Sequence, residues 1–216
     1  MIIAIDGPAG SGKGTAAKII AKKINAVYID TGAMYRCVAL EAINKNIKIE
    51  ETEKIQKLLD NINIDLKQEE GILKTYLNNK DVSSEIRTEE VSKFASAYSV
   101  IDIVREKMVK LQREMAISKD VVMEGRDIGT VVFPNADIKV YLDASSEERA
   151  KRRFKQNKEK GIDSNYEDIL KEIEIRDKRD ITREISPLRK ANDAIYIDST
   201  NLTIDEVVNK ILELIK

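Results

Sequence analysis

The stretch GPAGSGKGT at residues 7–15 constrains the fold of this chain more than any other part of its sequence. It follows an apolar run typical of a buried strand (2–6) and leads into a stretch with the composition of a helix (13–24). Its glycines have no side chains, so consecutive backbone N–H groups can converge on one anion, and the N-terminus of the helix adds positive charge. Lys13 supplies a cation that can bridge nucleotide phosphates. The stretch therefore predicts a phosphate-binding loop, here called the phosphate loop.

The rest of the chain alternates between short apolar runs and helix-like stretches. The apolar runs lie at 2–6, 26–30, 121–124, 138–143 and 194–199, and the helix-like stretches at 13–24, 33–45, 88–118, 146–160, 165–180 and 204–216. This alternation predicts an α/β fold in which a five-stranded parallel sheet is flanked by helices. The 88–118 stretch is long enough to be broken into two helices. Ligands of open α/β sheets collect at the carboxyl ends of strands, where this chain has Asp6, Asp30, Glu124 and Asp143. Such residues are also typical helix caps.

Two segments depart from this alternation. Residues 61–87 alternate apolar and polar side chains, with turn residues at QEEG (68–71) and NNKD (78–81), and predict a small antiparallel β insertion. Residues 152–169 are densely charged around Gly161 and are a candidate mobile segment.

The composition narrows the class of protein. The 216 residues suffice for one α/β domain, and 37 Lys and Arg against 38 Asp and Glu make no general case for binding nucleic acid or an acidic membrane. No apolar run is long enough to span a membrane, and Cys37, the one cysteine, suits a reducing compartment, so we expect a cytoplasmic protein. The chain has no histidine that could act as a general base. This suits a reaction in which the phosphoryl group is transferred to another phosphate, because an ionised phosphate has no proton to lose. Asp or Glu could still act as the base for a hydroxyl acceptor.

Arginine residues follow the ends of the predicted strands. Arg36 lies in DTGAMYR and Arg126 in EGRDIGT, after the second and third strands. In EIRDKRDITR, the spacing of Arg176, Asp180 and Arg183 places them on one face of a helix that continues that far. A guanidinium group can bind two oxygens of one phosphate at once. Several arginines near the strand ends are therefore what a site for two nucleotides would need. The RDKRD run by itself is equally typical of a solvated helix with ion pairs.

Five motifs together make the chain resemble the bacterial-type cytidylate kinases, which are nucleoside monophosphate kinases. The motifs are IDGPAGSGKGT, DTGAMYR, DVSSEIRTEEV, EGRDIGTVVFPNADIKVYLDASSEERAKRR and EIRDKRDITREISPL, and the resemblance covers nearly the whole chain. It implies transfer of the γ-phosphoryl group of ATP to CMP or dCMP in pyrimidine nucleotide metabolism, with Mg²⁺ as cofactor. It also implies one kinase domain over 1–216, with an inserted nucleoside-monophosphate-binding lobe near 61–98 and a lid near 149–165.

The resemblance also implies roles for individual residues. ATP would bind to Gly7, Pro8, Ala9, Gly10, Ser11, Gly12, Lys13, Gly14 and Thr15 of the phosphate loop, and to Arg149 and Arg153 of the lid. CMP would bind to Thr31, Arg36, Ser96, Arg105, Arg126, Asp127, Arg176, Asp180 and Arg183. Of the latter, Ser96, Arg105 and Asp127 would contact the cytosine ring, Arg176 and Asp180 the sugar, and Arg36, Arg126 and Arg183 the phosphate. Lys13, Arg126 and Arg183 would be catalytic.

Two of these assignments have a chemical rationale of their own. Because residue 14 is glycine where the general motif has Ser or Thr, Thr15 supplies the hydroxyl for Mg²⁺, directly or through water. Cytosine presents an amino donor and ring acceptors, which Asp127 and Arg105 match, whereas uracil would leave buried groups unpaired. Without the resemblance, Ser96 and Arg105 are equally typical of a helix surface.

Two other functions stay open from the residues alone. One is a kinase with the same loop for another small acceptor, such as UMP, AMP or a hydroxyl-bearing metabolite. The other is a GTPase-like switch, which the absence of an Asn-Lys-x-Asp motif disfavours. The expected partners are small nucleotides, with no nucleic acid and no membrane, and the protein is expected to be a monomer.

Overall fold

In the computed structural model, which describes residues 1–69 and 72–215, the chain folds into two compact units. The first unit comprises Met1–Tyr28 and Ser118–Lys216, and the second comprises Ile29–Ile117. The predicted lobe at 61–98 belongs to the second unit and the predicted lid at 149–165 to the first.

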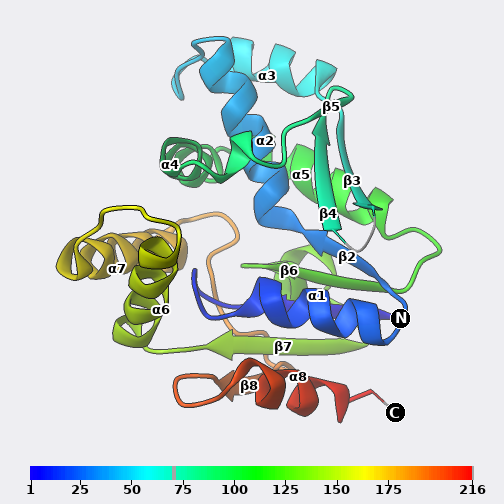
Figure 1. Ribbon diagram of the computed structural model, residues 1–216. Helices are drawn as coiled ribbons and strands as arrows, with labels where there is room; N and C mark the ends of the chain where they lie inside the picture. The colour runs from blue at the N-terminus through cyan, green and yellow to red at the C-terminus, as the bar shows by residue number, and fades with distance from the viewer. Residues whose placement is uncertain (70–71, 216) are drawn as a thin grey trace. The chain divides into compact units, whose positions relative to one another are not determined.

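The first unit is built on the predicted sheet (Figure 1). Its strands are β1 (Ile2–Asp6), β2 (Val27–Asp30), β6 (Val121–Gly125), β7 (Ile138–Asp143) and β8 (Ile195–Asp198), in the order β2-β6-β1-β7-β8. β2 starts in the first unit and ends in the second. The pairings of β1 with β6 and β7, and of β7 with β8, are parallel. The prediction of an α/β fold with a five-stranded sheet flanked by helices is confirmed, and the strand ends lie within one residue of those expected.

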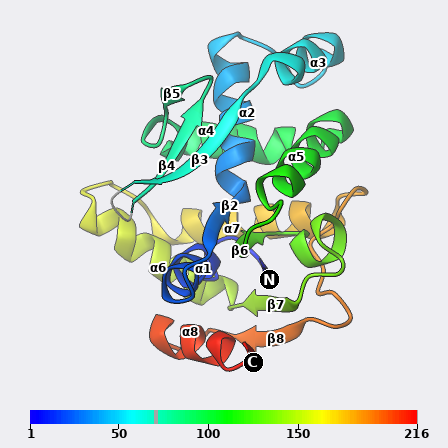
Figure 2. The same ribbon diagram turned by 90° about the vertical axis from the view of Figure 1, so that its right-hand side faces the viewer.

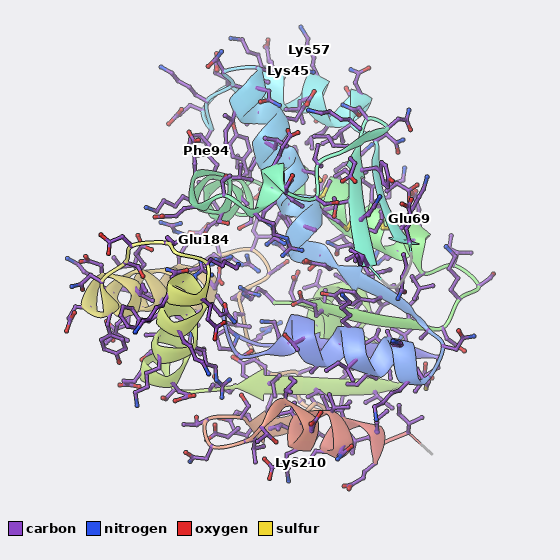
Figure 3. The ribbon with its side chains drawn as sticks, in the orientation of Figure 1. Lys45, Lys57, Glu69, Phe94, Glu184 and Lys210 are labelled. Atoms are coloured by element: carbon purple, nitrogen blue, oxygen red, sulfur yellow. The ribbon has the colours of Figure 1, made fainter. Side chains whose placement is uncertain are left out.

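Helices of the first unit follow the strands as expected. They are α1 (Lys13–Lys23), α6 (Ser146–Glu159), α7 (Tyr166–Thr182) and α8 (Ile204–Leu212), with one π-helical turn, η2 (Ile128–Val132), after β6. Helices α1 and α8 contact each other, and α6 lies beside α7 (Figures 1 and 2). The N-terminus of α8 has a capping box, in which Thr203 and Glu206 satisfy each other's backbone N–H groups. Lys210 lies on the exposed face of α8 (Figure 3).

The second unit contains the predicted antiparallel insertion. Its elements are α2 (Thr31–Asn44), α3 (Thr52–Asn61), β3 (Ile64–Glu69), β4 (Ile72–Leu77), β5 (Lys80–Asp81), the short 3₁₀ helix η1 (Glu85–Arg87), α4 (Glu89–Tyr98) and α5 (Asp102–Met115). Strands β3, β4 and β5 form a three-stranded antiparallel sheet (Figure 2). The predicted turn at NNKD joins β4 to β5 through Asn78 and Asn79, both with positive φ. Residues 70 and 71 of the predicted QEEG turn lie outside the described residues.

The core of the second unit forms around α2. Met34, Cys37 and Val38 are fully buried, and burial raises the pKa of the Cys37 thiol to about 12. α4 packs against α2, with Phe94 on its more exposed side (Figure 3). Tyr98 at the end of α4 is also fully buried, and its hydroxyl donates a hydrogen bond of 2.6 Å to the carbonyl oxygen of Ile47. Among the residues that the structure describes, none forms a helix long and apolar enough to cross a membrane.

Candidate active site

The phosphate loop connects β1 to α1, as predicted. Gly7 passes so close to β7 that a Cβ atom there would lie 2.0 Å from the carbonyl oxygen of Leu142. Gly12 has a left-handed backbone with φ of 93° and is the N-cap of α1. Because glycine has no side-chain acceptor, it leaves the first N–H groups of α1 to a ligand. The loop therefore has the geometry of an anion site.

Lys13 is held inside this loop. Its side chain is almost entirely buried, and its Nζ donates a hydrogen bond of 2.7 Å to the carbonyl oxygen of Pro8. Burial, followed by the positive charge of Arg126, lowers the pKa of Lys13 to about 7. An anion beside this ammonium group would stabilise its charged form. Ser11 is also buried, and its Oγ has no hydrogen-bond partner among the described residues.

Gly14 explains the departure of this loop from the general motif. A Cβ atom at this position would lie 3.3 Å from both Oε1 of Glu124 and Oη of Tyr28. A serine or threonine side chain here would crowd these two groups, and the hydroxyl of this segment is instead that of Thr15, which is exposed in the first turn of α1. No group of three or more acidic, Cys or His side chains able to hold a metal occurs within 1–69 and 72–215.

Arg149 from α6 braces the phosphate loop. Its guanidinium donates to the carbonyl oxygens of Ala9 (3.0 Å) and Ala144 (2.9 Å). The same group forms a two-point ion pair with Asp177 of α7, at 3.1 and 2.5 Å. Arg149 is 4% exposed, whereas Arg153, the other predicted lid arginine, is exposed. The interaction with Asp177 was not predicted, and contact of Arg149 with ATP stays a prediction.

The turn after β6 joins the phosphate loop to a second group of predicted residues. The two carboxylate oxygens of Asp6 accept backbone N–H groups from Ile128 (2.8 Å) and Gly129 (2.7 Å) at the start of η2. Arg126 and Asp127 immediately precede these two residues. Burial raises the pKa of Asp6 to about 7, in spite of the two hydrogen bonds. Sequence reasoning identified Asp6 only as a strand-end carboxylate.

Charged residues from this turn and from α7 come together in the first unit. Arg126 donates from Nε to Oδ2 of Asp180 at 2.9 Å, and Nη2 of Arg183 lies 4.0 Å from Oδ1 of Asp127. Burial acts to raise the pKa of Asp180, but neighbouring guanidinium groups, Arg126 first, hold it below its usual value. The positive charge of Arg176 also lowers the pKa of Asp180. α7 ends at Thr182, so Arg183 is the C-cap residue rather than part of the helix.

In the second unit, Asp30 organises the start of α2. Its Oδ1 caps the helix by accepting from the backbone N–H of Ala33, and its Oδ2 pairs with Arg36 (3.1 Å) and Arg87 (3.3 Å). Thr31 is buried in the first turn of the same helix. Arg87 was not predicted, although it lies in DVSSEIRTEEV, one of the five motifs that carry the family resemblance. Two arginines on one carboxylate leave a surplus of positive charge.

Ser96 and Arg105 are buried, so the interpretation of either as a helix-surface residue is wrong. They are 7% and 3% exposed, respectively. Arg105 donates from Nη1 to the carbonyl oxygen of Ser99 at 3.1 Å, and its guanidinium lies 5.6 Å from the centroid of the Tyr35 ring. A buried guanidinium on an aromatic ring is a rigid donor suited to recognition of a planar group.

Comparisons with known proteins agree on one family. The family model described as Cytidylate kinase matches residues 3–216. The cytidylate kinase of Caldicellulosiruptor saccharolyticus is 54% identical over 212 residues, covering 98% of this chain and 94% of that protein. The cytidylate kinase of Bacillus subtilis is 50% identical over 214 residues, covering 99% and 96%.

Solved structures support the fold alone. An uncharacterized protein from Eubacterium ventriosum is similar with a TM-score of 0.52 at 16% identity, covering 100% of this chain and 98% of that chain. The protein TT1252 from Thermus thermophilus has a TM-score of 0.50 at 17% identity, covering 100% and 98%.

Proposed function

Since this chain belongs to the cytidylate kinase family, we infer that it transfers the γ-phosphoryl group of ATP to CMP or dCMP, giving ADP and CDP or dCDP. The observation that carries this inference is the match of the family model to residues 3–216, together with 50–54% sequence identity to two cytidylate kinases over nearly the full chain. The buried lysine inside a glycine-lined loop supports it, because phosphoryl transfer depends mainly on positioning and on stabilising negative charge.

On the donor side, we propose that the phosphate loop binds ATP. The backbone N–H groups of residues 7–15 and the N-terminus of α1 would hold the phosphates, and Lys13 would neutralise the charge that develops on the transferred group. Mg²⁺ bound with ATP would supply further charge neutralisation, and the exposed hydroxyl of Thr15 is the group of this chain proposed to hold it. Arg149 and Arg153 are proposed to act with a lid at 149–165.

On the acceptor side, the residues proposed to bind CMP are those that the family resemblance implies: Thr31, Arg36, Ser96, Arg105, Arg126, Asp127, Arg176, Asp180 and Arg183. The inserted lobe at 61–98 is proposed to take part in binding the monophosphate. Arg126 and Arg183 would stabilise the transferring phosphoryl group. The acceptor is itself a phosphate that is ionised near neutral pH, so no base is required and a chain without histidine suffices.

Asp127 is the residue proposed to select cytosine. As a buried acceptor it would receive the amino group of cytosine, whereas uracil presents a carbonyl oxygen there. We expect Asp127→Ala to reduce the preference for CMP over UMP, measured as the ratio of kcat/KM values, by about tenfold or more, since a mispaired buried group costs about 1–3 kcal/mol. An unchanged ratio would contradict this role.

The test of the function is a panel of acceptors. ADP release is measured with ATP and Mg²⁺ and with CMP, dCMP, UMP, AMP or GMP as acceptor. We expect CMP and dCMP to give the highest kcat/KM. Preference for AMP or GMP, or turnover that does not depend on any monophosphate, would refute the proposal.

We further propose that the enzyme is a cytoplasmic monomer. Light scattering coupled to gel filtration tests whether it is monomeric.

A further inference from the structure

Asp6 connects the phosphate loop, proposed to bind ATP, to the turn after β6, whose Arg126 and Asp127 are proposed to bind CMP. It is the last residue of β1, directly before Gly7 of the phosphate loop, and is 5% exposed. Its Oδ1 and Oδ2 each accept one backbone N–H, from Ile128 and Gly129. One carboxylate thus fixes the turn that carries Arg126 and Asp127 to the strand that carries the phosphate loop.

The start of η2 depends on an acceptor from outside the turn. The first carbonyl oxygen of the turn, that of Asp127, accepts from Val131 and Val132. Ile128 and Gly129 are the first residues of η2, so their N–H groups have no acceptor within their own turn. Asp6 accepts both, from a point 122 and 123 residues earlier in the chain. A buried N–H without an acceptor is costly, so the position of the turn is tied to this side chain.

The carboxylate lies in close packing with Gly129 and Lys139. A Cβ atom on Gly129 would lie 3.4 Å from Oδ2 of Asp6 and 3.2 Å from Cδ of Lys139. Lys139 is itself buried and fixed, because its Nζ donates to the carbonyl oxygen of Pro134 and pairs with Asp193. Gly129 is therefore enclosed between the Asp6 carboxylate and a fixed alkyl chain.

We propose that Asp6 is a positioning residue for the acceptor nucleotide. It holds Arg126 and Asp127 at a set distance from the phosphate loop, so that base recognition and phosphoryl transfer share one rigid frame. The inference rests on the proposed function, in which Asp127 reads cytosine and Arg126 meets the phosphate. Asp6 acts through the turn and touches no reacting atom itself.

The first test is Asp6→Asn. The amide keeps the size of the carboxylate but replaces one acceptor oxygen by an NH₂ donor, which faces a backbone N–H, so only one of the two hydrogen bonds survives. We expect KM for CMP to rise at least tenfold and the preference for CMP over UMP to fall, while KM for ATP changes less than threefold. Asp143→Asn is the matched control, because Asp143 ends the neighbouring strand β7 and its carboxylate accepts from Ala144 and Tyr196 instead. It should leave KM for CMP within twofold of the wild type.

A second variant keeps the proposal testable if Asp6→Asn fails to fold. Gly129→Ala retains the carboxylate but adds a methyl group that would lie only 3.2 Å from Cδ of Lys139, so the turn and this side chain must move apart slightly. We expect a rise in KM for CMP that is smaller than that of Asp6→Asn. If every variant that folds keeps KM for CMP and the CMP-to-UMP ratio within twofold of the wild type, whatever its thermal stability, Asp6 is structural only and the proposal is overturned. Failure of the proposed function is distinguishable, since it would appear in the wild-type enzyme as a lack of CMP phosphorylation.

Discussion

The ion pair between Arg149 and Asp177 allows a quantitative prediction for the substitution Asp177→Asn. This change keeps the shape of the side chain but removes the charge that neutralises Arg149. Removing one partner of a buried pair costs about 3–5 kcal/mol, because the remaining charge is buried without compensation. The side chain of Arg149 is 5% exposed and that of Asp177 16%. Arg149 would still donate to the carbonyl oxygens of Ala9 and Ala144, so we expect the lower end, about 3 kcal/mol.

Thermal unfolding followed by circular dichroism measures this loss. For a protein of this size about 1 kcal/mol shifts Tm by about 2–4 °C, so Asp177→Asn should lower Tm by about 6–12 °C. The control is Lys93→Ala, which removes an exposed pair with Glu89 one helical turn away, with side chains 62% and 65% exposed. It should cost less than about 0.5 kcal/mol. If Asp177→Asn lowers Tm no more than this control does, the buried charge of Arg149 does not need Asp177 to compensate it, and the reasoning is refuted.

Three further predictions concern the phosphate loop and α8. Lys13→Ala should lower kcat by about a thousandfold or more while the circular dichroism spectrum stays unchanged, because it removes the cation proposed to neutralise the transferring group; near-normal turnover would contradict that role. Since the pKa of Lys13 is lowered to about 7, the free enzyme is largely neutral at this position at pH 8, and ATP should restore the charged form. Calorimetry in buffers of different ionisation enthalpy should therefore detect proton uptake on ATP binding at pH 8 and little at pH 6, and equal uptake at both would argue against the lowered pKa. Thr203→Ala removes the cap of α8 and should cost about 1 kcal/mol in urea unfolding with kinetics unchanged, whereas a loss below about 0.3 kcal/mol would show that the capping box contributes little.

The strands and most helices could be predicted because their signals are local. Each strand of the large sheet is a short apolar run, and the phosphate loop has fixed residue types at fixed spacing. α3 was missed although its signal is present. Ile55, Leu58 and Leu59 have helical spacing and are all buried, but dense charge around them obscured the pattern. The 88–118 stretch divides at 99–101 into α4 and α5, as its length allowed.

The parts of the site that could not be predicted depend on partners distant in sequence. η2 has no local signal, because its first N–H groups are satisfied by Asp6, more than 120 residues earlier. Asp177 stands in the RDKRD run, which is typical of a solvated helix, and only the packing of α6 on α7 brings it to Arg149. Lys178 and Arg179 of the same run are exposed, so that interpretation is correct for them. Roles for individual nucleotide-binding residues came from the family resemblance and await the kinetic tests.

The burial of Cys37 makes its thiol a probe of transient opening of the core of the second unit. The thiol is wholly enclosed in the core around α2, and its raised pKa leaves almost no reactive thiolate near neutral pH. A disulfide reagent such as Ellman's can therefore reach the sulfur only in molecules whose core has transiently opened. With one cysteine in the whole sequence, the labelling rate of the unmodified protein measures the frequency of that opening without any introduced probe.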